Sequence, residues 1–242
     1  MASTVRLFLI GLLALLILNI FSYHIPKPTY SNSWNHSSTA SRLPTATHLV
    51  KHAMGETLVP LQPQRVVALH PYAAEVARMF GIKLLGAPKR IFLPPQLRQN
   101  DIVDIGWFPP NMEKVLALKP DLLLGSVGWF QDTYNLWSQI APTVLDSQEY
   151  HGQWKEPFMQ VAEALGQTES AKQIVGQYNA RVAEFKQKMG ERLKTTKVSV
   201  VQIMPGSIEF VKKSAFSGVI LEDLGFARPL LQDMDAKTSL QL

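Results

Sequence analysis

IGWFPPNMEKVLALKPDLLLG, residues 105–125, carries the elements on which the fold assignment rests. Asn111 can cap the short helical pattern that follows it, and Pro120 ends that pattern because a proline cannot continue a helix. The run DLLLG at residues 121–125 is short, apolar and closed by a glycine, which predicts a buried strand. A helix that leads directly into a buried strand is typical of a parallel α/β sheet.

The same alternation extends on both sides of this stretch. Short apolar runs that predict strands lie at residues 65–69, 84–87, 102–105 and 143–145. Helical patterns lie at residues 73–80, 133–140 and 154–165. Strands that alternate with helices predict a mostly parallel sheet, and ligands of such sheets bind beyond the carboxyl ends of the strands. The residues after these ends are rich in aromatic and basic side chains, which predicts a binding site and not a catalytic one.

A long helical pattern follows at residues 168–193. Thr168 can cap its start, and apolar residues recur at steps of three or four, so one face is expected to be buried. These apolar positions are Ala171, Ile174, Val175, Tyr178, Val182, Phe185 and Met189. At ~1.5 Å per residue such a helix spans about 39 Å, a length that suits a strut between two lobes.

The first residues are expected to lie outside the fold. Arg6 precedes an uncharged, mostly apolar run at residues 7–21, which predicts a secretory signal or an uncleaved membrane anchor over residues 1–22. Both interpretations stay open. Residues 23–50, rich in proline and serine, are expected to form a linker. The protein is therefore predicted to be periplasmic or otherwise extracytoplasmic, with anchoring to the inner membrane as the second possibility.

The composition excludes several functional classes. Hydrophobic residues make up 46% of the 242 residues and charged residues 18%, which allows a packed core. The net charge of +5 includes no lysine–arginine run, so we predict no nucleic-acid partner. The chain contains no cysteine, which excludes disulfides, thiolate metal sites, cysteine nucleophiles and a lipid-modified cysteine. Neither a nucleophile elbow nor a phosphate-binding loop is present, so no enzymatic activity is expected.

Several stretches, taken in order, carry a resemblance to a known family. They are HAMGETLVP (52–60), PQRVVAL (63–69), GIKLLGAP (81–88), the stretch at 105–125, IAPTV (140–144), KVSVV (197–201) and LEDLGFARP (221–229). Together they resemble the helix-linked class of binding proteins of ABC importers, which includes the iron–siderophore and vitamin B12 binders. The most specific piece is P-N-x-E followed by L-K-P-D-L, and the resemblance covers residues 50 to 230.

The resemblance implies an α/β fold of two Rossmann-like lobes joined by one long helix, with the ligand between the lobes. The N-terminal lobe is expected at residues 51–166, the interlobe helix at 167–195 and a partial C-terminal lobe at 196–242. The implied function is that of an extracytoplasmic solute-binding component that captures a ferric siderophore and delivers it to the permease. The expected partners are the ABC permease subunits and the iron chelate, and the protein is expected to be a monomer.

The resemblance also assigns roles to individual residues. Glu113 is expected to dock onto permease arginines, although an ordinary exposed glutamate in a first helical turn fits the same position. Because a siderophore already coordinates its iron, the protein needs aromatic surfaces and cations and no metal ligand or cofactor of its own. The candidate ligand contacts are Tyr72, Lys89, Arg90, Trp107, Trp129, Phe130, Met204 and Phe216. For each of these eight residues, ordinary packing or solvation remains an equal alternative.

The histidines give weaker signals. His48 and His52 have a spacing that chelates metal on a helix, but they fall where the family has an extended hairpin, so no metal site is predicted there. His70 follows a strand, and it can either line the ligand cleft or simply cap it. Both interpretations of His70 stay open.

The second lobe is expected to be incomplete. Strands at 197–204 and 208–211 and a helix at 216–224 predict its α/β character. It is shorter than the first lobe, so we expect Val198, Val200 and Ile220 to carry uncovered apolar surface. The alternatives to siderophore transport are therefore a truncated, membrane-anchored remnant without transport activity, or a binder of heme or cobalamin.

Overall fold

A computed structural model describes residues 46–88, 102–147, 152–204 and 207–233. The predicted signal or anchor at 1–22 lies outside the described residues, as does most of the predicted linker. Within the described ranges, no helix combines the length and the apolar character needed to cross a bilayer.

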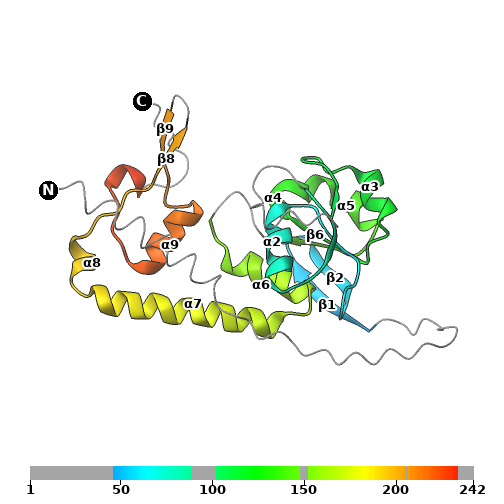
Figure 1. Ribbon diagram of the computed structural model, residues 1–242, viewed down its shortest axis with the longest axis horizontal. Coiled ribbons are helices and arrows are strands. Elements are labelled where there is room, and N and C mark those ends of the chain that lie inside the picture. Colours follow the sequence, from blue (N-terminus) through cyan, green and yellow to red (C-terminus); the bar gives the residue numbers. More distant parts are fainter. Residues whose placement is uncertain (1–45, 89–101, 148–151, 205–206, 234–242) are drawn as a thin grey trace. The chain divides into compact units, whose positions relative to one another are not determined.

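The first lobe, which Figure 1 shows around β6, contains a parallel sheet of five strands in the order β5-β4-β3-β6-β7. The strands are β3 (Val66–Ala68), β4 (Leu84–Ala87), β5 (Val103–Asp104), β6 (Leu122–Ser126) and β7 (Thr143–Asp146). Every residue of β3, β6 and β7 is buried, as expected for a parallel sheet with both faces covered. The predicted parallel α/β sheet is confirmed.

Helices cover this sheet on both faces. They are α2 (Pro71–Met79), α3 (Met112–Ala117), α4 (Val127–Phe130), α5 (Tyr134–Ser138) and α6 (Lys155–Ala164), with a short 3-10 turn, η2, at Gln131–Thr133. Alternate residues along β6 belong to two separate cores, because successive side chains of a strand point to opposite faces. Leu124 packs with residues of α2 and α6, whereas Leu123 packs with Val115 of α3 and Trp137 of α5.

The helix start predicted at Asn111, within residues 105–125, is confirmed. The Asn111 side chain accepts a hydrogen bond from the backbone N–H of Lys114 at 2.8 Å and caps α3. Asp121, at the start of the following strand region, accepts the backbone N–H groups of Gln64 and Arg65 at 2.8 and 2.9 Å. These bonds tie β6 to the beginning of β3, its neighbour in the sheet.

An antiparallel hairpin precedes the sheet, formed by β1 (Thr47–His52) and β2 (Gly55–Pro60). It begins inside the segment predicted as linker, because the pairing extends as far as Thr47 with Pro60. His52 holds the hairpin against β7: its Nε2 bonds to Thr57 Oγ1 at 2.9 Å and its Nδ1 accepts the backbone N–H of Leu145 at 3.4 Å. His48 donates from Nε2 to the carbonyl of Glu163 at 3.0 Å.

The long helix is shorter than predicted. Helix α7 covers Thr168–Met189, and Gly190, with φ of 52°, ends it before the short α8 (Arg192–Thr195) begins. At ~1.5 Å per residue α7 is about 33 Å long. Within α7 only Ala171 and Tyr178 are buried, so most of the face predicted to be buried is covered incompletely.

The second lobe is built differently from the first in the part that the structure describes. An antiparallel pair, β8 (Val201–Met204) and β9 (Ser207–Phe210), precedes α9 (Phe216–Leu224) and the turn η3 (Leu230–Gln232). The predicted strand at 197–204 is reduced to β8 and a single parallel bridge between Lys197 and Ala227. The predicted end of α9 at Gly225 is confirmed, with a left-handed φ of 81°.

The apolar exposure expected in this lobe lies on other residues than those predicted. Ile220 is only 6% exposed because it belongs to the buried side of α9, and Val198 and Val200 are partly buried. Phe216 of α9 and Leu230 of η3 are exposed instead, as are four apolar side chains of β8 and β9: Val201, Ile203, Ile208 and Phe210. Their pairing in the hairpin places Val201 opposite Phe210 and Ile203 opposite Ile208, so they share one face.

Candidate functional site

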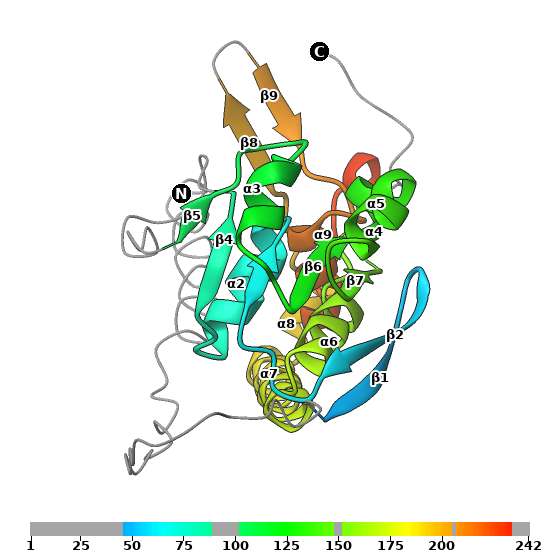
Figure 2. The ribbon, with the colours of Figure 1, turned by 90° about the vertical axis from the view of Figure 1, so that its right-hand side faces the viewer.

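The strand order of the first lobe defines where a ligand should bind. From β3 the chain winds outward through β4 to β5, and it then returns to the other side of β3 to form β6 and β7 (Figure 2). The winding direction therefore reverses between β3 and β6. In open α/β sheets the crevice beyond the carboxyl ends of the strands at this reversal is the usual ligand site.

Three aromatic side chains lie at this position, and we call them the aromatic rim: His70, Phe108 and Trp129. His70 follows β3, and Trp129 lies on α4, which follows β6. Their rings stack with centroids 5.6 Å apart and planes 29° apart. Phe108 packs edge-on against Trp129 at 4.9 Å, and its side chain is 51% exposed. A half-exposed aromatic cluster at a ligand-binding edge provides a surface on which a flat or bulky ligand can stack.

His70 has a defined role in the backbone beneath the rim. It is the N-cap of α2, and its Nδ1 accepts the backbone N–H of Tyr72 at 3.3 Å. Burial lowers the pKa of His70 from 6.5 to about 4. The imidazole is therefore neutral at pH 7. Because Nδ1 is an acceptor, the single ring proton is carried by Nε2.

Buried polar groups lie next to the rim. Ser126 ends β6 and donates from Oγ to Asp146 Oδ2 on β7 at 3.1 Å, and both residues are fully buried. The Tyr72 hydroxyl donates to the carbonyl of Trp154 at 3.2 Å. Burial, and secondarily the charge of Asp146, raises the pKa of Tyr72 above its usual range. The Tyr72 hydroxyl therefore keeps its proton and acts as a hydrogen-bond donor.

The predicted ligand residues have different positions. Trp129 is part of the rim, and Trp107 and Tyr72 are partly buried on the same side of the first lobe. Phe130 is 2% exposed and packs against Trp137 at 6.3 Å, so it supports the rim from the core and offers no surface to a ligand. Lys89 and Arg90 lie outside the described residues.

The remaining candidates lie on other elements. Met204 ends β8, and Phe216 is the half-exposed first residue of α9. Glu113 is exposed in the first turn of α3, where the positive end of the helix favours a carboxylate. No group of three or more potential metal-ligating side chains exists among the described residues.

Sequence reasoning missed Phe108 and left His70 undecided. The available signal for both was position: His70 directly follows β3 at the reversal point, and Phe108 lies in the loop after β5, at the same carboxyl edge of the parallel sheet. Phe108 also follows Trp107 directly in the loop at the start of the stretch at residues 105–125.

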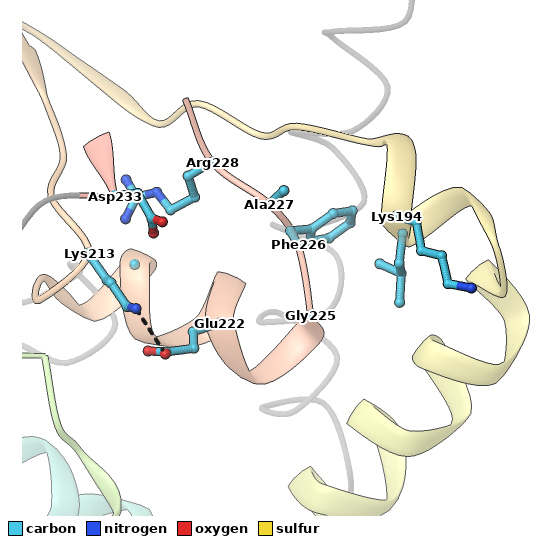
Figure 3. Close-up of a pocket in the computed structure, with 10 residues that line it drawn as sticks. Lys194, Lys213, Glu222, Gly225, Phe226, Ala227, Arg228 and Asp233 are labelled. Atoms are coloured by element: carbon cyan, nitrogen blue, oxygen red, sulfur yellow. Dashed lines mark ion pairs between the residues drawn. The ribbon is translucent and has the colours of Figure 1, made fainter. Parts of the chain in front are cut away.

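A cavity also lies elsewhere, in the second lobe, with a volume of about 390 Å³ (Figure 3). None of the three rim residues lines it. Its charged groups compensate one another: Lys213 pairs with Glu222 at 3.3 Å, and Figure 3 places the carboxylate of Asp233 beside the guanidinium of Arg228. Arg228 also donates to the carbonyl of Val211. We therefore assign the candidate site to the rim and not to this cavity.

The comparison with protein families gives one match. Residues 102–233 match the family described as periplasmic binding protein. This range begins at the strand region before the rim residue Phe108 and ends in the last described turn of the second lobe.

Individual relatives agree with this match. The chain is 33% identical over 205 residues to "Probable siderophore-binding lipoprotein YfiY" of Bacillus subtilis, covering 82% of this chain and 62% of the relative. Among solved structures, it is similar to Staphylococcus aureus SirA complexed with staphyloferrin B, with a TM-score of 0.67, 32% identity, and coverage of 77% of this chain and 66% of SirA. The iron-uptake system-binding protein FeuA of Bacillus subtilis has the same fold, with a TM-score of 0.69 at 23% identity, covering 80% of this chain and 71% of FeuA. The chain thus spans about three-fifths of the length of YfiY and two-thirds of that of SirA.

Proposed function

This chain belongs to the periplasmic binding protein family, and from that premise we propose that it is the extracytoplasmic solute-binding component of an ABC importer that captures a ferric siderophore. The observation that carries the proposal is the aromatic rim at the reversal point of the sheet. The ligand class is supported by two relatives: YfiY, described as a probable siderophore-binding lipoprotein, and SirA, whose structure is a complex with staphyloferrin B.

The proposed mechanism is capture without chemistry on the ligand. A siderophore surrounds its iron with oxygen ligands, so the binding protein contacts only the outer surface of the chelate. Stacking on Trp129 and Phe108 removes apolar ring surface from water, at about 25 cal/mol per Å² buried. The neutral Nε2–H donor of His70 can satisfy an oxygen atom of the chelate at the edge of the stack, whereas the Tyr72 hydroxyl already donates its proton to the Trp154 carbonyl. We accordingly propose that the protein is not an enzyme and that it supplies no iron ligand.

The ligand is tested by titration of tryptophan fluorescence. The purified protein is titrated with ferric siderophores of the catecholate, hydroxamate and carboxylate classes, and with heme and cobalamin. We expect saturable quenching by at least one ferric siderophore, reduced in the Trp129→Phe variant. The visible absorption of the chelate should keep its shape on binding, since the protein adds no iron ligand. If only heme or cobalamin quenches the fluorescence saturably, the ligand is not a ferric siderophore. If the folded protein shows no quenching with any of these ligands, the proposal is contradicted.

We further propose that Glu113 contacts the permease. Its carboxylate is exposed on a capped helix, on a different element from the rim, and an arginine of a partner can bind it through two parallel hydrogen bonds. The Glu113→Ala variant should keep the wild-type affinity for the ligand and lose iron uptake in cells. Glu156→Ala, an exposed first-turn glutamate of α6, is the matched control and should retain uptake. Loss of ligand binding in Glu113→Ala would contradict the docking role.

A further inference from the structure

His70 combines three properties that packing alone does not require. It occupies the N-cap of α2, its ring stacks on Trp129, and it follows the strand at the reversal point of the sheet. Serine, threonine, aspartate and asparagine are the usual N-cap residues, because their short side chains reach the first free N–H groups of the helix. The His70 side chain also accepts a hydrogen bond from a free N–H group of the helix, and its ring in addition stacks on a neighbouring aromatic side chain.

The cap fixes the hydrogen-bonding character of the ring. A backbone N–H can only donate, so the bond from Tyr72 makes Nδ1 the acceptor and leaves the proton on Nε2. Among the described residues no group bonds to Nε2, and this atom is not among the buried polar atoms that lack a partner. Nε2–H is therefore a donor at the surface of the rim, held in one tautomer and in one position.

The surroundings of this donor are aromatic. Trp129 lies against the ring face of His70, and Phe108 stands at the edge of Trp129, half exposed. A ligand that contacts Nε2–H through an oxygen atom must therefore place the group that bears this oxygen beside exposed rings. An aryl group satisfies both demands, because it stacks on aromatic side chains and can carry a phenolate oxygen at its edge. An aliphatic carboxylate gains no stacking, and its charge is best matched by a guanidinium.

We infer that His70 is a specificity-determining residue that selects iron chelates with aryl oxygen ligands, of the catecholate type, over aliphatic carboxylate and hydroxamate chelates. The inference rests on the proposed function and names its ligand class. His70 acts in it as a ligand contact, in addition to its role as the cap of α2.

The experiment compares three simple probes on the same protein. The iron(III) complexes of 2,3-dihydroxybenzoate, citrate and acetohydroxamate are titrated into the wild-type protein by calorimetry, with each chelator alone as the blank. We expect the dihydroxybenzoate complex to bind at least tenfold more tightly than the other two.

Two variants separate the cap from the ligand contact. His70→Asn keeps a strong N-cap and removes the ring, so its melting temperature should stay close to that of the wild type. Its affinity for the dihydroxybenzoate complex should fall about tenfold, and its affinity for the citrate complex should not change. His70→Phe keeps a stacking ring and removes Nε2–H, so it should lose only part of the preference.

The outcomes are distinguishable. A His70→Asn variant that binds the dihydroxybenzoate complex like the wild type would show that His70 only caps the helix, and would overturn the inference while leaving the proposed function intact. A wild-type preference for citrate or acetohydroxamate would overturn the ligand class. Binding of none of the three, nor of any larger ferric siderophore, would overturn the proposed function itself. If the variants do not fold, the ¹⁵N shifts of His70 in the wild type decide, measured with the diamagnetic gallium(III) complex of 2,3-dihydroxybenzoate: a direct contact should move Nε2 more than Nδ1, which stays bonded to the backbone N–H of Tyr72.

Discussion

The two lobes differ in how completely other elements cover their β-strands. In the first lobe, strands β3, β6 and β7 are buried on both faces between two groups of helices. In the described part of the second lobe, the β8–β9 pair leaves Ile203 76% and Ile208 52% exposed. A two-stranded hairpin is at best marginally stable by itself, whereas a covered sheet of five strands supplies a cooperative core. The aromatic rim belongs to the first lobe, so the candidate ligand surface rests on the more rigid part.

The largest expected difference is in the cost of removing an apolar side chain from each sheet. Leu124 of β6 is fully buried, and Leu124→Ala should lower the free energy of unfolding by about 2–5 kcal/mol through lost burial and the cavity left behind. Ile203→Ala on β8 should change it by less than about 0.5 kcal/mol, because that side chain is already in water. Urea denaturation followed by circular dichroism measures both. Equal losses would mean that the face of β8 and β9 is covered in solution, which would contradict the difference in coverage between the two lobes.

The difference between the lobes also explains why the strands of the first lobe were predicted correctly from the sequence and those of the second lobe were not. In the first lobe each short apolar run is a strand, because a sheet covered on both faces leaves no ambiguity about which face is buried. In the second lobe the run at 197–204 forms only β8 and a single bridge. Ile220 was expected to be exposed because the strands that would cover it were expected to be missing. It is buried instead, on the inner side of α9.

Within the site, the sequence predicted the edge of the sheet at which the ligand residues lie, but not the directions in which their side chains point. Trp129 and Phe130 are adjacent, and both were predicted to contact ligand. They lie on the single turn α4, which the sequence did not indicate, and successive residues of a helix point about 100° apart. Trp129 therefore stacks in the rim while Phe130 enters the core. The end of α7 at Gly190 was missed for a similar local reason, since a glycine inside an otherwise periodic pattern is often tolerated.

A second prediction concerns acid stability, which should report on the rim of the first lobe. Burial lowers the pKa of His70 to about 4, compared with 6.5 in an exposed histidine. The unfolded chain therefore binds a proton at this site at higher pH than the folded protein does. The contribution of His70 to stability is present above pH 6.5 and is lost as the pH falls from 6.5 to 4. At about 1.4 kcal/mol per pKa unit, the loss should be about 2–3 kcal/mol.

The His70→Asn variant isolates this contribution. Other groups, including His52, whose pKa is also lowered by burial, are present in both proteins and cancel in the comparison. The difference between the unfolding free energies of wild type and variant should therefore change between pH 6.5 and 4 and stay constant above pH 7. A difference that does not depend on pH would mean that His70 is as hydrated in the folded protein as in the unfolded chain, and the rim would then be more open than the stacking with Trp129 indicates.

The smallest expected effect lies where α9 of the second lobe meets α6 and α7. The Asp223 carboxylate accepts a hydrogen bond from the Tyr178 hydroxyl at 2.7 Å and pairs with Lys155 at 2.9 Å. Asp223 and Lys155 are 25% and 38% exposed, so solvent screens the ion pair and the hydrogen bond carries more of the stabilisation. Asp223→Ala should therefore cost about 1–2 kcal/mol. Asp223→Asn, which keeps an acceptor for Tyr178, should cost about 0.5 kcal/mol.

The control for this contact is Glu184→Ala on the exposed face of α7. Glu184 pairs with Lys188 four residues later, and because both side chains are exposed to solvent, this pair should contribute little to stability. An independent readout comes from Tyr178, whose pKa is raised first by burial and then by its hydrogen bond to Asp223. Removing Asp223 should lower the tyrosine pKa in an ultraviolet titration, and removing Glu184 should not. If Asp223→Ala and Glu184→Ala behave alike in both measurements, then this contact does not hold α9 against α6 and α7, and other contacts, such as that of Phe185 with Phe226, must do so.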